Sequence, residues 1–332
     1  MSDYSISDLD RAFSPSYCTA NKMANPKAVI DDFIQSQSAH YEENLRDIPH
    51  YLNVSYGEQK FDLWGSHLKT PEHIFVFVHG GYWQLFLLQE GSKDLSTSFV
   101  GPLVSNNMVV AVIGYDFAPY KTIPQIVNQY ISGLYPASKL ILCGHSAGAH
   151  LVTKAIEKGC VSANKIALFC GIFTKLEELV PTYIGRDIKL SLEIALESNV
   201  DVEKLAKHLS DTKVLILCAE HDAPKIQSQN EEIQSRFTEL GVTCESKTIS
   251  GSNHFSIIER LYDSQAEQTK TLFKHDAPKI QSQNEEIQSR FTELGVTCES
   301  KTISGTNHFS IIERLYDSQA EQTKTLLKFI QG

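Results

Sequence analysis

Residues 140–159 read LILCGHSAGAHLVTKAIEKG, and this sequence indicates the fold class more directly than the rest of the chain. Four apolar residues run directly into Gly144-His145-Ser146-Ala147-Gly148, and residues 147–159 then have the pattern of a helix. A buried strand, a sharp turn and a helix in this order place a serine at the C-terminal end of the strand, with its hydroxyl exposed. The N-terminus of the helix favours negative charge at the same point. Ser146 is therefore the candidate nucleophile.

Further short apolar runs surround this unit. Strands of a parallel sheet that are covered on both faces are apolar throughout. The runs therefore predict buried strands at 73–80, 108–116, 165–173 and 213–220. Helices are predicted at 26–46, 123–135, 147–159 and 256–274, and a hairpin at 51–65 around Gly57. Strands alternating with helices predict an α/β fold with a mostly parallel, doubly wound sheet and helices on both faces. The hairpin at the N-terminal edge fits an α/β-hydrolase arrangement.

A second glycine turn follows the strand at 73–80. It reads His79-Gly80-Gly81-Tyr82-Trp83. Glycines let the main chain turn its N–H groups inward, as an oxyanion hole requires. We expect donors from Gly80 or Gly81, completed by the N–H of Ala147. Tyr82 and Trp83 are predicted either to line a flat substrate pocket or to pack in the core, and His79 is predicted to be structural.

A nucleophilic serine needs a base, and the base needs an acid to orient it. In this fold the chain order is serine, acid, histidine. Asp222 follows the apolar run 213–220, and His254 follows the predicted last strand, 244–250, so both come where the acid and the base are expected. Glu220 is the alternative acid. The histidines next to these positions are predicted to be structural: His145, His150 and His221.

The C-terminal part of the chain contains a near-identical repeat. Residues 221–274 recur as 275–328, with Ser252 replaced by Thr306 and Phe273 by Leu327. Two such similar copies indicate a recent duplication or an error in the assembled gene. We expect one domain over 1–274, with 275–332 appended or partly disordered. His308 has the same local sequence as His254 and is the alternative base.

Composition narrows the classes of function. The net charge is −10 without a cluster of Lys or Arg, so we expect neither nucleic-acid nor membrane partners. No apolar run approaches the roughly 20 residues that span a bilayer, and the N-terminus lacks the pattern of a secretory signal. Seven cysteines, an odd number without zinc-site spacing, predict free thiols, a reducing cytoplasmic location and no metal. The oligomeric state stays open, with a homodimer as one option.

With these motifs the sequence resembles the kynurenine formamidases (arylformamidases) of the α/β-hydrolase superfamily, which are related to esterases of the hormone-sensitive-lipase type. The resemblance covers roughly residues 40–274. It rests on motifs at 79–83 (HGGYW), 115–119 (YDFAP), 144–151 (GHSAGAHL), 171–180 (GIFTKLEELV) and 253–255 (NHF). The duplicated segment departs from the family pattern.

The resemblance implies hydrolysis of the small molecule N-formyl-L-kynurenine to kynurenine and formate in tryptophan breakdown. It also implies Ser146 as nucleophile, Asp222 as acid and His254 as base, without a metal or organic cofactor. Two other functions stay open. One is a broad-specificity carboxylesterase, and the other is a non-catalytic binding protein that the duplication has inactivated.

Overall fold

The computed structural model describes residues 6–19, 25–84, 93–129 and 139–276. The chain divides into two units, Met1–Asp276 and Ala277–Gly332. His308 and nearly all of the second copy lie outside the described residues. The predicted domain limits, 1–274 and 275–332, therefore stay a prediction.

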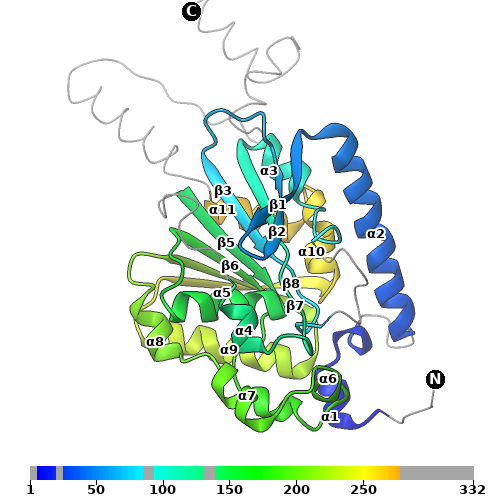
Figure 1. The fold of residues 1–332 in the computed structure, drawn as a ribbon, viewed down its shortest axis with the longest axis vertical. Coiled ribbons are helices and arrows are strands. Elements are labelled where there is room, and N and C mark those ends of the chain that lie inside the picture. Colours follow the sequence, from blue (N-terminus) through cyan, green and yellow to red (C-terminus); the bar gives the residue numbers. More distant parts are fainter. Residues whose placement is uncertain (1–5, 20–24, 85–92, 130–138, 277–332) are drawn as a thin grey trace, which may run out of the picture. The chain divides into compact units, whose positions relative to one another are not determined.

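An eight-stranded sheet forms the centre of the first unit, in the order β1-β2-β4-β3-β5-β6-β7-β8 (Figure 1). Neighbours from β4 to β8 pair in parallel, whereas β2 pairs antiparallel with β1 and β4. The predicted mostly parallel α/β sheet is confirmed. The strands are β1 His50–Tyr56, β2 Gln59–Trp64, β3 His73–Val78, β4 Met108–Ile113, β5 Leu140–His145, β6 Lys165–Phe169, β7 Lys213–His221 and β8 Cys244–Asn253.

The N-terminal hairpin forms where the alternating pattern predicted it. Tyr56 pairs with Gln59, which leaves a two-residue turn that begins at Gly57. Gly57 has φ +54°, a conformation that glycine adopts without the steric cost of a Cβ atom.

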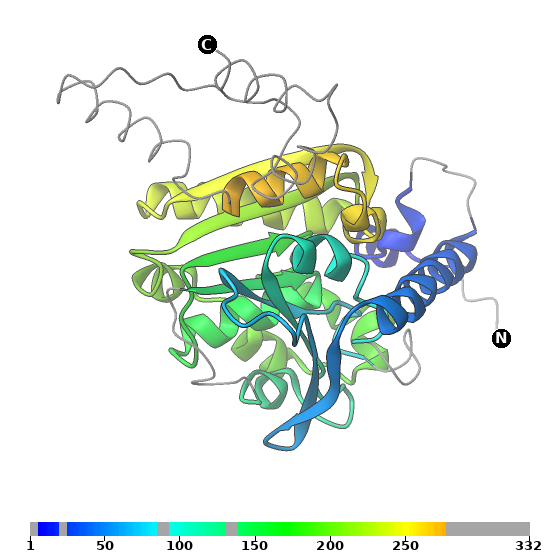
Figure 2. The ribbon, with the colours of Figure 1, turned by 90° about the horizontal axis from the view of Figure 1, so that it is seen from above.

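Helices cover both faces of the sheet, and alternate strand residues enter two separate cores. Ile74 and Val78 of β3 belong to one core, whereas Phe75 and Phe77 belong to the other. The first core includes residues of α4, α5, α8 and α9, and the second includes residues of α3, α10 and α11 (Figures 1 and 2). These helices are α3 Val100–Ser105, α4 Ile123–Val127, α5 Ala147–Glu157, α8 Val202–Lys207, α9 Pro224–Glu239, α10 Ser256–Glu259 and α11 Glu267–Asp276.

The remaining elements lie at the N-terminus and after β6. They are α1 Asp8–Ala12, η1 Pro15–Tyr17, α2 Pro26–Asp47, η3 Leu176–Leu179, α6 Tyr183–Asp187 and α7 Leu192–Ser198. The predicted helix at 26–46 is thus confirmed as α2. Within the described ranges, no helix combines the length and the apolar character that a bilayer crossing needs.

Two helices differ from expectation. The segment after His254 reads as one continuous helix, but α10 is followed by the short 3₁₀ helix η4 (Arg260–Tyr262), a break and then α11. At the break the Asp263 carboxylate accepts the Gln265 N–H at 2.8 Å, a local side-chain bond that competes with helical hydrogen bonding. The helix expected at 123–135 is shorter than predicted, because α4 ends at Val127 and a turn follows at 128–129. Residues 130–138 lie outside the described part.

Candidate active site

Ser146 lies in a strained turn between β5 and α5. Its φ and ψ are +55° and −120°, a conformation that non-glycine residues rarely adopt. Its N–H donates to the Phe169 carbonyl of β6 at 2.8 Å, which fixes the turn against the next strand. A Cβ at Gly148 would lie 2.0 Å from the Val78 carbonyl oxygen. Glycine at 148 therefore lets α5 begin directly against the end of β3.

The glycine turn after β3 packs on Ser146. A Cβ at Gly80 would lie 3.0 Å from the Ser146 Cβ. Within the described residues, the N–H groups of Gly80, Gly81 and Ala147 have no hydrogen-bond acceptor. These N–H groups, which come from the turn after β3 and from the start of α5, are those that an oxyanion hole beside Ser146 would use.

His79 stabilises this turn from behind. Its Nδ1–H donates to the Gly80 carbonyl at 2.8 Å, and Tyr115 donates its hydroxyl hydrogen to the His79 carbonyl at 2.9 Å. The His79 and Tyr115 rings stack with centroids 4.2 Å apart. Burial lowers the pKa of His79 to about 4, so its ring is neutral at physiological pH. These contacts fit the structural role expected for His79.

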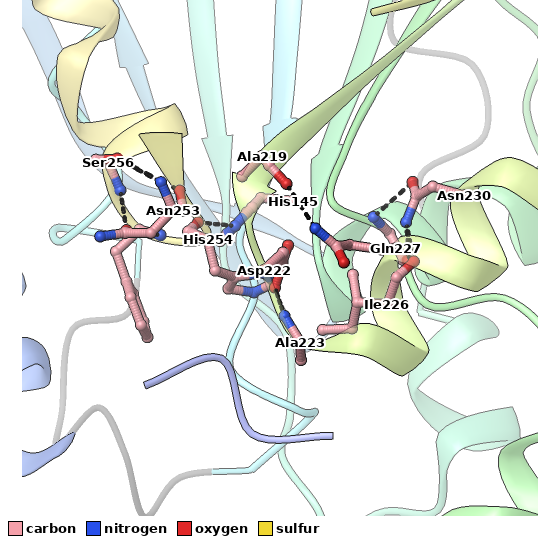
Figure 3. Close-up of polar contacts among 12 residues, drawn as sticks. His145, Ala219, Asp222, Ala223, Ile226, Gln227, Asn230, Asn253, His254 and Ser256 are labelled. Carbon is pink, nitrogen blue, oxygen red and sulfur yellow. Dashed lines mark hydrogen bonds and ion pairs between the residues drawn. The ribbon is translucent and has the colours of Figure 1, made fainter. Parts of the chain in front are cut away.

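Asp222 and His254 form a buried pair. His254 Nδ1 donates to Asp222 Oδ2 at 2.9 Å, and the Ala223 N–H donates to the other carboxylate oxygen at 2.6 Å (Figure 3). Glu220, the alternative acid, is exposed and accepts the Gly251 N–H at 2.7 Å. Glu220 thus holds the turn before His254, whereas Asp222 contacts the histidine itself.

The loop that carries His254 is held on two sides. Asn253 Oδ1 accepts the N–H groups of Phe255 and Ser256, at 3.0 and 2.9 Å, and so forms the start of α10 (Figure 3). His145 Nε2 lies 2.9 Å from the His254 carbonyl oxygen, and the two rings are 4.6 Å apart. Because a carbonyl only accepts, the His145 proton is on Nε2. The pKa of His145 lies well below its usual value because of burial and the nearby His254, so the ring stays neutral.

Ser146 and His254 line one cavity, which is largely apolar and aromatic. Its other walls include His79, Gly80, Gly81, Tyr82, Phe33, Tyr183 and Phe255. Pro15 and Ser16 of η1 also line it, so the N-terminal segment covers the candidate site. Tyr82 joins this cover to the glycine turn, because its hydroxyl donates to the Phe13 carbonyl at 2.6 Å.

Trp83 differs from Tyr82 in its position. Its side chain is fully buried and is absent from the described lining of the cavity. It packs edge-on against His150 with ring centroids 5.0 Å apart, and His150 donates from Nε2 to the Ser198 carbonyl at 2.7 Å. Trp83 therefore lies behind Tyr82, whose ring centroid is 6.1 Å away.

Several cavity residues had no sequence signal. Pro15 and Ser16 lie in a segment that reads as an ordinary loop, and Phe33 lies in a helix that is distant along the chain. Cys170 was predicted only as a buried free thiol, yet its sulfur lies close to Asp222 and His254. Sγ of Cys170, a carboxylate oxygen and a ring nitrogen are all within 4.8 Å of one another. We assign no metal there, because the His254 ring nitrogen that faces Asp222 carries a proton, which it donates to the carboxylate.

The arrangement of strands is shared with solved hydrolase structures. A putative thioesterase from Silicibacter sp. TM1040 superimposes with a TM-score of 0.59 at 23% identity, over 78% of this chain and 97% of that chain. A hormone-sensitive lipase from a metagenome library gives 0.52 at 18% identity, over 73% and 89%. The chain thus has the α/β-hydrolase fold. No family model matches the sequence.

Sequence comparison is more specific than the fold. The kynurenine formamidase of Danio rerio is 29% identical over 305 residues, which cover 82% of this chain and 98% of that protein. The chain is similar in sequence to kynurenine formamidases. The Drosophila melanogaster kynurenine formamidase is also 29% identical, over 76% of this chain and 91% of that protein. The similarity therefore extends over almost the full length of these two formamidases.

Proposed function

We propose that the chain is a serine hydrolase that converts N-formyl-L-kynurenine to L-kynurenine and formate in tryptophan degradation. The observation that carries the proposal is the buried His254–Asp222 pair, whose histidine lines the same cavity as Ser146. The formamidase relatives support the substrate. None of the described cysteines forms a disulfide, which supports a cytoplasmic location.

The reaction begins with proton transfer from Ser146 to His254. Nδ1–H of His254 stays bonded to Asp222, so Nε2 is free to accept the serine proton as the hydroxyl oxygen attacks the formyl carbon. The carbonyl oxygen becomes an oxyanion, for which we propose Gly80, Gly81 and Ala147 as N–H donors. Losing one such donor costs comparable enzymes about 3–4 kcal/mol of transition-state stabilisation.

Breakdown of the tetrahedral intermediate releases kynurenine. Protonated His254 gives its proton to the departing aryl nitrogen, the C–N bond breaks, and a formyl ester remains on Ser146. A water molecule then loses a proton to His254 and attacks the ester. The ester bond to Ser146 breaks, Ser146 recovers its proton from His254, and formic acid leaves and ionises to formate.

The aromatic walls suit the substrate. We propose that the aryl ring lies against Tyr82, with Phe33, Tyr183 and Phe255 completing the pocket and Trp83 supporting Tyr82 from behind. Ring contacts of this kind contribute about 0.5–1.5 kcal/mol beyond the burial of area.

The test is hydrolysis of formylkynurenine by the purified 332-residue chain, with Ser146→Ala as the inactive control. An aryl acetate ester and an organophosphonate that labels active serines are run beside it. Preference for the formamide supports the proposal. Preference for esters would make the chain a broad carboxylesterase, and absence of both turnover and labelling would make it a non-catalytic binding protein.

A further inference from the structure

Cys170 lies between the strand of the nucleophile and the strand of the acid. It directly follows β6, whose last residue, Phe169, accepts the Ser146 N–H at 2.8 Å. On the other side, the Cys170 N–H donates to the Leu217 carbonyl of β7 at 2.9 Å, and β7 ends one residue before Asp222. The sheet therefore places residue 170 beside both halves of the candidate site.

The backbone at Cys170 is in a costly conformation. Its φ is +46°, a value that disfavours any residue with a Cβ, and its side chain is fully buried. Glycine would adopt this φ freely, and the next residue, Gly171, is a glycine. A strained residue beside an active site is a reason to look for a role of its side chain.

The side chain of Cys170 lies against the acid–base pair. Its sulfur is within 4.8 Å of both an Asp222 oxygen and a His254 ring nitrogen. The carboxylate accepts hydrogen bonds from the Ala223 N–H and from His254, and a buried ionised carboxylate can accept about four. Burial, and next the charge of Asp222, raise the pKa of Cys170 well above its usual value. The thiol is therefore neutral and has a proton to donate.

We propose that Cys170 is a positioning residue that donates its S–H to the Asp222 carboxylate and holds it in place for His254. This inference rests on the proposed catalytic roles of Ser146, Asp222 and His254. The Ala223 N–H and the thiol would then fix the carboxylate, so that its remaining lone pairs face His254 Nδ1.

Removing the thiol has a predictable electrostatic effect. With one donor fewer, the Asp222 charge is less neutralised and binds protonated His254 more tightly. Protonated His254 is less able to accept the Ser146 proton, so the acidic limb of the rate profile moves to higher pH.

No other group near the pair obscures that limb. The titratable groups near Asp222 or His254 in the described structure include Cys18, Tyr82, His145, Cys170 and Cys218. Burial raises the pKa of each thiol and of the phenol, to about 12 for Cys218, and lowers the pKa of His145. All five are therefore neutral where a catalytic histidine titrates.

The experiment compares Cys170→Ala, Cys170→Ser and Cys143→Ala in the full chain. Cys143 is equally buried, lies on β5 and is the control for lost core volume. The rate of Ser146 labelling by an organophosphonate is measured from pH 5 to 9, with kcat and KM for the formamide in parallel. Labelling does not depend on the substrate, so failure of the substrate assignment and failure of the positioning role are told apart.

In Cys170→Ala we expect the acidic limb to move up by about half a pH unit, as loss of one hydrogen bond to a charged group can cause. We expect kcat to fall several-fold with KM unchanged. The hydroxyl of Cys170→Ser should restore both values, and Cys143→Ala should leave the limb in place. The proposal would be overturned if the labelling rate fell at the same acidic pH in all three variants. It would also be overturned if the unmutated chain bound one metal ion per chain and Cys170→Ala did not.

Discussion

At the scale of single residues, the two carboxylates that the sequence left in competition have separate tasks. Asp222 is buried and bonded to His254, and Glu220 is exposed and bonded to the turn before it. In a regular strand, residues 220 and 222 would point to the same side. The register between β7 and β8 shifts between Ala219 and His221, however, and β7 ends at His221, so Asp222 lies beyond the regular strand. One acid near the end of β7 therefore faces the site, and the other faces solvent.

Substitution of the two acids by their amides should separate these tasks. Asp222→Asn keeps the shape of the side chain but removes its charge. The amide faces His254 Nδ1 with either an N–H or a neutral oxygen, so the tautomer of His254 is no longer fixed. We expect a loss of about 10⁴-fold in kcat, as in comparable triads. Glu220→Gln should stay within about twofold. Formylkynurenine turnover under saturating substrate measures both, and similar losses in the two variants would contradict the assignment.

The buried neutral histidines predict how stability depends on pH. Burial lowers the pKa of His79 to about 4 and of His150 to about 3, whereas both take up protons near pH 6.5 when unfolded. The unfolded state therefore binds more protons below pH 6.5. This stabilising contribution is complete above pH 6.5 and falls as the pH drops towards the folded pKa values.

We expect each of these two histidines to reduce the free energy of unfolding by about 1.4 kcal/mol per pH unit below pH 6. Urea titrations at pH 7.5, 6 and 5 measure the slope. His150→Gln, whose amide can still donate to the Ser198 carbonyl, should make the slope shallower by about one proton. An unchanged slope in this variant would contradict the buried neutral state of His150.

At the scale of elements, the contact between α5 and β3 builds the site. The first turn of α5 approaches the end of β3 so closely that residue 148 can have no side chain. The same contact brings the glycine turn at Gly80 against Ser146. The position of the candidate oxyanion hole thus depends on one helix–strand distance.

Gly148→Ala should therefore destabilise the protein more than a glycine-to-alanine substitution in a helix usually does. The added Cβ would lie 2.0 Å from a backbone oxygen, so α5 must move away from β3. We expect loss of soluble protein, or a fall of several degrees in Tm together with loss of Ser146 labelling. Gly101→Ala in α3 is the matched control, because its Cβ would meet only an atom 3.9 Å away. Comparable Tm values for the two variants would count against this geometry.

Elements with a strong local pattern could be predicted from the sequence, and those that depend on distant contacts could not. The runs at 73–80 and 140–145 became β3 and β5 because their composition suits burial on both faces. The break at Asp263 was missed because one side-chain hydrogen bond decides it. The cover of the cavity by Pro15 and Ser16 was missed because residues near the N-terminus meet the site only through the tertiary fold. Ser146, Asp222 and His254 could be proposed from chain order, but the contact of Cys170 with Asp222 has no local pattern.

At the scale of the whole molecule, the unit Met1–Asp276 already holds one complete set of the proposed catalytic residues. Asp222 and His254 pair within it, and β8 pairs with β7 directly beside them. The first copy of the repeated segment therefore suffices for the proposed chemistry. His308 stays an alternative base only if the second copy of the repeated segment takes the position of the first copy in the sheet.

Deletion of residues 275–328 should leave an active enzyme. The remaining 278 residues (332 − 54) keep every strand of the sheet, so we expect kcat/KM within about threefold of the full chain. In the full chain, His254→Ala should abolish turnover and His308→Ala should not. The reverse result would mean that the second copy supplies the base, and an inactive full chain beside an active shorter chain would mean that the repeat blocks the site.

The unusual backbone angles around the site lower the stability of the fold in return for a working active site. Tyr82, Trp83, Ser146 and Cys170 all have positive φ, and all lie just beyond the ends of β3, β5 or β6. At about 1–2 kcal/mol each, this conformation is a large share of the 5–15 kcal/mol by which a typical domain is stable. Ser146→Gly should therefore melt at a higher temperature than Ser146→Ala, although both are inactive. Selection for heat resistance alone would remove these residues and the catalytic site with them.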